Sequence, residues 1–405
     1  MSPQQGAGSA DMTPVGNLSG LTVLDLSGSP APSFAGSLLA DFGAFVVVVE
    51  PPGGSPLRKL GPAAVQQVWW PIAARNKFSL ALDVARPEAA PVVTRMLAQA
   101  DVILRDDTAS PWIEAVHRGA GGPVDVHIYA PGADRPDLWS GSTDPRLATA
   151  ATGAMALTGD KDAAPCQAEF PLTDYCAGML AAASALIELR ACRSEDRSAR
   201  PISIGLHEAL LRMNEWQLVF ATGRGYAEQR NGNRFPLNVN IGNIFRTQDN
   251  RLVTLSAATA PVAARLLSLI GGEALRDDPR FATAAARRDN MDALELIIGD
   301  WIARHDAADV LRMGREADVV IGPIMDADDI AAHPQVAALG SVVQVSLPDG
   351  GSIAMPAVFP RIDGVEAEIR HAGGTIGAHS DLVLGRFGLT PQEIGALRQS
   401  RTVWM

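Results

Sequence analysis

Cysteine and lysine are both scarce in this chain of 405 residues. Its three cysteines, Cys166, Cys176 and Cys192, are an odd number without the paired spacing of a zinc site. They support neither a disulfide framework nor a bound metal, and a reducing cytoplasm suits such a chain best. Nearly all of the 34 basic residues are arginine, since only three residues are lysine.

The sequence also has an excess of negative over positive charge and lacks long apolar runs. The net charge of −11 at pH 7 argues against a nucleic-acid partner, which would require a basic face. No apolar run approaches the roughly 20 residues that span a bilayer, so we expect no membrane partner. Residues 1–18 lack the basic start and apolar core of a secretory signal, and they predict a flexible tail.

The composition that remains is that of a globular protein, with 47% hydrophobic and 20% charged residues. Residues 23–26, 34–42 and 45–49 have the patterns of a strand, a helix and a second strand, with a break at 30–33. This βαβ unit predicts a parallel sheet that is buried on both faces.

Further segments of the first half extend the same alternation. Strands are predicted at 78–84, 101–106 and 123–130, helices at 87–100 and 171–192, and a strand followed by one long helix at 200–225. The first half is therefore predicted to be a doubly wound α/β domain.

A nicotinamide dinucleotide is a poor candidate ligand for this domain. Glu50 ends the second strand, where a dinucleotide-binding fold places the acid that binds the ribose. The loop after the first strand lacks the glycines of that fold, because Gly28 is followed by Ser29, Pro30 and Ala31.

The pattern changes from about residue 226, where asparagine and glycine become frequent. We expect a hairpin over 244–257, mostly helix over 260–317, strands within 340–360 and a capped final helix at 390–399. The predicted organisation is a tail at 1–18, a large domain at 19–225 to which 346–405 returns, and a small α+β domain at 226–345.

The stretch FPLTDYCAGMLAAASALIELRACR, residues 170–193, places a carboxylate at the start of an apolar helix. A helix N-terminus stabilises negative charge, so Asp174 could be held there as a reactive carboxylate. Thr173 or Asp174 could equally be an ordinary N-cap, which leaves both alternatives open. The larger apolar residues of this helix are predicted to be core packing: Met179, Leu180 and Leu186.

Nine segments occur in an order that is informative as a set. They are LTVLDLSGSPAPSFAGSLLADFGAFVVVVEPPGGSPLR, ARNKFSLALDV, ADVILRD, TGAMALTGD, PLTDYCAGMLAAASALIELR, IGLHEALL, DDPRFATAAARRDN, IGPIMDADDIAAHPQV and IGAHSDLVLGRFGLTPQEIGAL. Together they resemble the class III coenzyme A transferase family, also called the CaiB/BaiF type, over about residues 20–400.

The resemblance implies a fold and a function. Family members have a Rossmann-like large domain and a smaller domain, form an interlocked dimer, and transfer coenzyme A between carboxylic acids. The implied nucleophile is Asp174, which would form a mixed anhydride and then a thioester with coenzyme A. Coenzyme A would be a substrate, no metal is implied, and the partner chain would be a second copy or a close paralogue.

A basic segment of the family is also present. Asn76 and Lys77 match it, while Arg58, Lys59 and Arg75 add positive charge nearby. The resemblance implies that these five residues bind the phosphates of coenzyme A.

Departures from the family pattern keep two alternatives open. The usual Ala-Gly-Pro after the first strand is Ala31, Pro32 and Ser33 here, so a divergent structural partner of a catalytic paralogue is one alternative. A 2-methylacyl-CoA racemase is the other. Relatives that racemise use a histidine in the region where this chain has Ser142, Thr143 and Asp144, and we expect His207 to be structural.

Overall fold

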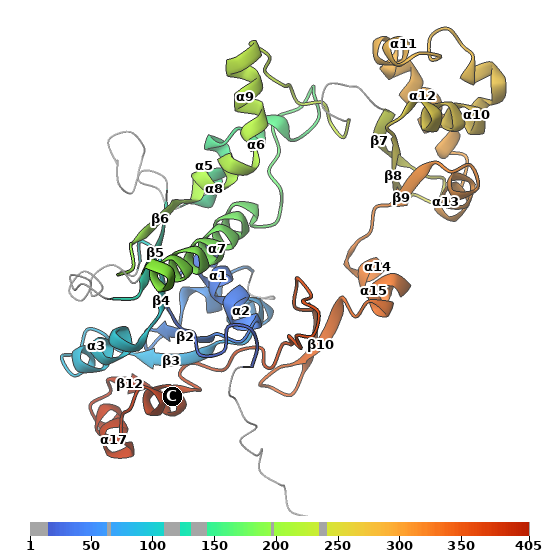
Figure 1. Cartoon of the computed structure of the whole chain (residues 1–405). Coiled ribbons are helices and arrows are strands. Elements are labelled where there is room, and N and C mark those ends of the chain that lie inside the picture. Colours follow the sequence, from blue (N-terminus) through green and yellow to red (C-terminus); the bar gives the residue numbers. More distant parts are fainter. Residues whose placement is uncertain are drawn as a thin grey trace, which may run out of the picture. The chain divides into compact units, whose positions relative to one another are not determined.

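The computed structural model describes residues 15–62, 66–108, 122–130, 144–195, 198–234 and 241–404 (Figure 1). Most of the predicted tail, together with Ser142 and Thr143, lies outside the described residues. The chain divides into two compact units. The first unit combines Met1–Thr152, Ala168–Met213 and Gln335–Met405, and the second combines Gly153–Gln167 and Asn214–Pro334. The predicted domain boundaries at 226 and 345 remain predictions.

A central sheet organises the first unit, and its described strands follow the order β12-β3-β2-β1-β4-β5-β6. All neighbouring strands are parallel except β12, which runs antiparallel to β3. The order 3-2-1-4-5-6 is that of the doubly wound dinucleotide-binding fold, so the predicted α/β class and parallel sheet are confirmed. The strands are β1 (Thr22–Asp25), β2 (Phe45–Glu50), β3 (Phe78–Leu82), β4 (Val102–Arg105), β5 (Val124–Tyr129), β6 (Ile202–Gly205) and β12 (Val403–Trp404).

Helices and one hairpin complete the first unit. Thr390 and Glu393 form the capping box predicted for the last helix. The elements are α1 (Pro30–Asp41), η1 (Pro56–Lys59), α2 (Gln66–Ala74), α3 (Ala89–Gln99), α5 (Pro145–Ala151), α7 (Leu172–Glu195), α8 (Leu206–Met213), β10 (Val342–Ser346), β11 (Ser352–Pro356), α16 (Ser380–Arg386) and α17 (Pro391–Gln399); α15 (Pro334–Ala338) begins at the boundary with the second unit.

The second unit packs helices on a three-stranded antiparallel sheet of order β7-β8-β9. Asn250, with φ +63°, lies in the turn between β7 and β8 and confirms the predicted hairpin. Its elements are α6 (Ala154–Leu157), α9 (Glu215–Arg224), β7 (Ile241–Arg246), β8 (Leu252–Ala257), α10 (Ala260–Arg276), α11 (Ala284–Asp289), α12 (Met291–Ile302), α13 (Ala307–Glu316), β9 (Val320–Pro323) and α14 (Ala327–Ala332).

Two predicted elements differ from the structure. The break predicted at residues 30–33 is instead the first turn of α1, because Pro30 occupies the first helical position, where its ring and its missing N–H are tolerated. The single helix predicted after β6 is divided into α8 and α9, with Asn214 between them.

Among the described residues, helix α7 buries one of its faces and leaves large apolar side chains of another exposed. Its small residues approach α1 closely, since a Cβ atom on Gly178 would lie 2.6 Å from the Ala31 carbonyl oxygen. Met179, Leu180 and Leu186 are 45%, 40% and 37% exposed, so their prediction as core packing was wrong. A helix that is apolar all round is expected to be covered on every side, and the part of the chain that the structure describes does not cover this side.

The same helix corrects an expectation about membranes. Among the described residues, α7 is long and apolar enough to cross a bilayer, although no apolar run of that length was expected. Such a length and composition are weak evidence of a membrane span, because core helices share them.

Candidate active site

Asp174 lies inside the first turn of α7. The Pro171 carbonyl accepts the Tyr175 N–H at 3.0 Å, which makes Pro171 the capping residue. Thr173 directs its hydroxyl to that of Thr149 in α5, with 2.6 Å between the oxygens. The N-cap alternative for Thr173 and Asp174 is therefore wrong, because α7 already begins at Leu172.

The surroundings of this carboxylate raise its affinity for a proton. Asp174 is only 4% exposed, and burial raises its pKa to about 6, although a hydrogen bond from its own backbone N–H favours the charged form. No described basic side chain forms an ion pair with it. At pH 7 roughly nine-tenths of the groups would still be ionised, so the site holds a poorly solvated carboxylate.

Contacts between α1 and α7 fix the position of Asp174. The rings of Phe34 and Tyr175 lie 4.5 Å apart between centroids, and Gly178 brings the two backbones together one turn later. Helix α1 begins immediately after the turn that follows β1. Ala31, beside Gly178, is therefore close to the carboxyl edge of the sheet in sequence, whereas Phe34, beside Tyr175, lies about one turn further along α1.

A hollow of about 540 Å³ lies at this edge, in the first unit. The loops after β1, β2 and β3 line it together with Thr108, which follows β4. Ser27 and Gly28 come from the β1 loop, and Asp83 comes from the end of β3. Ligands of open α/β sheets bind in this place, outside the carboxyl ends of the strands.

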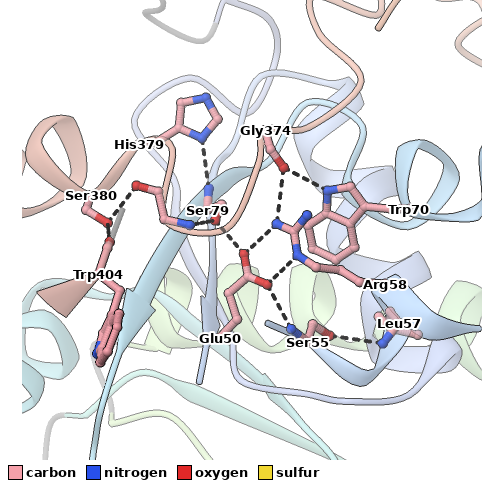
Figure 2. A network of polar contacts seen from close by, with 11 residues as sticks. Glu50, Ser55, Leu57, Arg58, Trp70, Ser79, Gly374, His379, Ser380 and Trp404 are labelled. Atoms are coloured by element: carbon pink, nitrogen blue, oxygen red, sulfur yellow. Dashed lines mark hydrogen bonds and ion pairs between the residues drawn. The ribbon is translucent and has the colours of Figure 1, made fainter. Parts of the chain in front are cut away.

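Glu50 points to the centre of a network of polar contacts (Figure 2). Its carboxylate accepts two hydrogen bonds of 2.7 Å from Arg58, one of 2.8 Å from the Ser55 N–H and one of 2.5 Å from the Ser79 hydroxyl. With 1% exposure and all of these partners, Glu50 has no lone pair directed to a ribose in the hollow.

Arg58 is held by residues from the far end of the chain as well as by Glu50. Its guanidinium lies 3.7 Å from the ring centroid of Trp70 and donates to the Gly374 carbonyl at 3.1 Å. The Trp70 indole N–H donates to the same carbonyl at 2.9 Å, and His379 accepts from the Ser79 N–H at 3.0 Å (Figure 2). The sequence predicted that residues 346–405 return to the large domain, but it did not predict the contacts of Gly374 and His379, because no local pattern signals contacts over such a separation.

Arg75 and Asn76 share one carboxylate. Asp41, at the end of α1, accepts from Arg75 at 2.5 Å and from the Asn76 amide at 2.9 Å. Asn76 adopts the left-handed conformation, with φ +60°, and it also binds the backbone of Glu368 and Arg370. Burial raises the pKa of Asp41, and the nearby Arg75 opposes this increase.

Lys77 is 1% exposed, and its ammonium group contacts only internal partners. It donates to the Asp25 carboxylate at 2.9 Å, to the Ser33 hydroxyl at 2.8 Å and to the Ser33 carbonyl at 2.5 Å. Burial lowers the pKa of Lys77, while Asp25 acts in the opposite direction. All three N–H donors are engaged, so none is left for a phosphate.

Four of the five basic-segment residues are thus bound to three different carboxylates, and none of the five lines the described part of the hollow. Only Lys59 presents its charge to solvent. The role of these five residues in coenzyme A binding stays a prediction. Within the described ranges, no group of three or more His, Cys, Asp or Glu side chains is placed to hold a metal ion.

Comparison with known proteins decides the family. The sequence model described as CoA-transferase family III matches residues 18–116 and 123–380. The chain belongs to CoA-transferase family III. The resemblance noted from the sequence is confirmed, and this protein is an enzyme of the CoA-transferase class whose substrate includes coenzyme A.

Relatives of this CoA-transferase match along nearly their whole length. The succinyl-CoA–D-citramalate CoA-transferase of Chloroflexus aurantiacus is 31% identical over 399 residues, which cover 95% of this chain and 98% of the relative. The succinyl-CoA–L-malate CoA-transferase beta subunit of the same organism is 27% identical over 410 residues, with the same coverage. A CaiB/BaiF family protein from Brucella suis shares the fold with a TM-score of 0.78, at 22% identity over 92% of this chain and 99% of that one.

Proposed function

We propose that this enzyme moves coenzyme A from an acyl-CoA donor to a carboxylic acid and that Asp174 is its nucleophile. The observation that carries the proposal is a buried carboxylate without a described cationic partner, placed in the first turn of α7 in a chain of this family. A buried structural carboxylate would be expected to have an ion pair, and Asp174 has none among the described residues.

The proposed reaction proceeds in four steps. A carboxylate oxygen of Asp174 attacks the thioester carbonyl of the donor and expels coenzyme A thiolate, which leaves a mixed anhydride. The thiolate attacks the aspartyl carbonyl, releases the donor acid and forms an enzyme thioester. The acceptor carboxylate then attacks this thioester and expels the thiolate again. Attack of the thiolate on the acceptor carbonyl gives the new acyl-CoA and returns Asp174.

Burial favours this chemistry because a poorly solvated carboxylate is a stronger nucleophile. A pKa of about 6 keeps Asp174 mostly ionised at neutral pH while increasing its basicity. Backbone N–H groups at the start of α7 favour the charged form.

We place the nucleotide part of coenzyme A in the hollow at the carboxyl edge of β1 to β4. Its volume of about 540 Å³ lies in the usual range for such ligands. We propose that the pantetheine arm extends from this hollow along α1 towards Asp174.

For the acids, the relatives suggest where to begin. Two relatives are named as transferases of succinyl-CoA with citramalate or malate, and another as a succinate–glutarate CoA-transferase. We propose succinyl-CoA as the first donor to test and dicarboxylates of four or five carbons as acceptors. A panel assay with mass detection of the acyl-CoA products identifies the pair.

We also propose that the enzyme is a cytoplasmic dimer, of two identical chains or with a paralogue. The exposed apolar side chains of α7 and α8 support a covering partner, and one relative is named as a subunit. Light scattering of the purified chain, alone and with coexpressed paralogues, tests this point. A lasting monomer at micromolar concentration would contradict it.

Trapping tests the nucleophile directly. Incubation with the acyl-CoA donor followed by hydroxylamine should leave a hydroxamate on the peptide that contains Asp174, and Asp174→Ala should remove it. Transfer that persists in this variant would refute the nucleophile. A wild-type chain that binds no coenzyme A would favour the structural-partner alternative, and exchange at C2 of a 2-methylacyl-CoA would favour the racemase.

A further inference from the structure

We propose that Lys77 is a positioning residue that acts through Asp25 on the β1–α1 turn, and that this turn forms one wall of the coenzyme A site. The inference rests on the proposed function, because it takes the hollow at the carboxyl edge as the nucleotide site. It assigns Lys77 a part that differs from the phosphate contact expected from the sequence.

Asp25 carries the connection because its two oxygens serve different partners. Oδ2 accepts from Lys77 at 2.9 Å, whereas Oδ1 accepts from the Ser27 hydroxyl at 2.6 Å and from the Ser27 N–H at 3.2 Å. Asp25 is 0% exposed, and Ser27 lines the hollow. A buried cation is thus linked to the wall of the site through one carboxylate.

Helix α1 packs directly against Lys77 and Asp25. A Cβ atom on Gly36 would lie 3.2 Å from Nζ of Lys77 and 3.4 Å from Oδ2 of Asp25, so the helix backbone lies directly against both groups. Ser33 supplies two acceptors to Lys77 and is one of the residues at which the chain departs from the family pattern. Its hydroxyl is therefore part of the support of this turn.

Gly28, the residue after Ser27, is also fixed by a buried carboxylate. Gly28 donates its N–H to the Asp106 carboxylate at 3.0 Å, and Asp106 also accepts from the Thr108 N–H at 3.0 Å. A Cβ atom on Gly28 would lie 3.1 Å from the Thr108 hydroxyl and 3.2 Å from Pro56. With two buried carboxylates fixing consecutive residues, the turn presents a preformed surface to a ligand.

Three variants separate positioning from direct contact. Lys77→Met leaves Asp25 buried without its cation, so the turn should shift. Lys77→Met with Asp25→Asn removes both charges, yet the Asn oxygen still accepts from Ser27. Lys77→Met with Asp25→Leu also removes both charges but provides no acceptor.

Calorimetry with coenzyme A and urea unfolding measure binding and stability of the three variants. We expect Lys77→Met to raise the dissociation constant at least about tenfold and to lower stability. The Asn double variant should recover the stability of wild type and bind coenzyme A with an affinity within about threefold of it. The Leu double variant should also recover stability, but it should bind coenzyme A at least about tenfold more weakly than wild type.

Ser27→Ala provides a check that leaves the ion pair intact. It should weaken binding of coenzyme A by about three- to tenfold, with little change in stability. Because neither Lys77 nor Asp25 contacts the ligand in this arrangement, the salt dependence of binding should be the same for wild type and the Asn double variant.

Several outcomes would overturn the inference. If the Asn double variant binds as weakly as Lys77→Met and has a smaller salt dependence than wild type, then Lys77 contacts a phosphate directly. Unchanged affinity in Lys77→Met, in Ser27→Ala or in a folded Leu double variant also refutes positioning. Failure of the wild-type chain to bind coenzyme A at millimolar concentration instead refutes the proposed function, and the inference with it.

Discussion

Replacing Asp174 with Asn should increase the stability of this protein while it abolishes coenzyme A transfer. The two side chains have nearly the same shape, so the change removes a charge and a nucleophile without opening a cavity. A residue that only supports the fold would behave in the opposite way, because its loss would cost stability.

The size of the gain follows from the pKa. Burial raises the pKa of Asp174 from 3.8 to about 6, a change of about two units, and each unit corresponds to about 1.4 kcal/mol. The charged wild-type side chain therefore destabilises the folded state by at most about 3 kcal/mol, and we expect a measured gain of about 1 to 3 kcal/mol for Asn at pH 8.

The gain must depend on pH with a defined sign. A carboxyl group with a raised pKa destabilises the folded state fully at pH values above its folded pKa of about 6. As the pH falls through that value, the folded wild type takes up a proton and its penalty decreases. The difference between Asn and wild type should therefore be smaller at pH 5 and vanish below about pH 4.

Urea unfolding followed by circular dichroism, at pH 8 and pH 5, gives these free energies, and the transfer assay gives the activity. Asp363→Asn is the matched control, because Asp363 is exposed and its stability should not change. An Asp174→Asn variant that is less stable than wild type at pH 8 would refute the argument that burial destabilises this carboxylate.

Further predictions concern the rest of the site. In wild type, kcat/KM should rise with pH through an apparent pKa of about 6 and level off above it, since Asp174 must be ionised to attack; a flat profile from pH 5 to 8 would contradict this. Gly178→Ala should cost about 1 to 3 kcal/mol in urea unfolding and lower transfer, because its Cβ would lie 2.6 Å from a backbone oxygen of α1. Arg58→Met should cost about 3 to 5 kcal/mol by leaving Glu50 buried and unpaired, and adding Glu50→Gln should restore much of it; equal stability of the two variants would argue against the ion pair as the cause. Lys59→Ala should weaken coenzyme A binding in a salt-dependent manner without changing stability, and an unchanged affinity would remove Lys59 from the phosphate site.

Local patterns in the sequence were enough to predict much of the fold. The apolar runs of β1 and β2, the helix between them and the capping box of α17 are properties of residues a few positions apart. Such short-range signals survive in any tertiary context. The order of motifs along the chain likewise identified the family without any coordinates.

What the sequence could not determine was which polar groups meet in the folded chain. Lys77 and Asp25 are 52 residues apart, and Arg58 and Gly374 are 316 apart, so neither contact leaves a local pattern. A run of basic residues looks the same whether its charges are solvated or paired. Only the tertiary structure directs Lys77 inward to Asp25 and leaves Lys59 in solvent.

The faces of α7 provide the same lesson for apolar residues. The sequence established that the helix is apolar all round, and burial of every face was the natural prediction. In the structure α1 covers the small residues around Gly178, and Met179 and Leu186 remain exposed. Periodicity reports how many faces of a helix are apolar, but packing decides which of them a chain covers itself, because that depends on neighbours brought together only by folding.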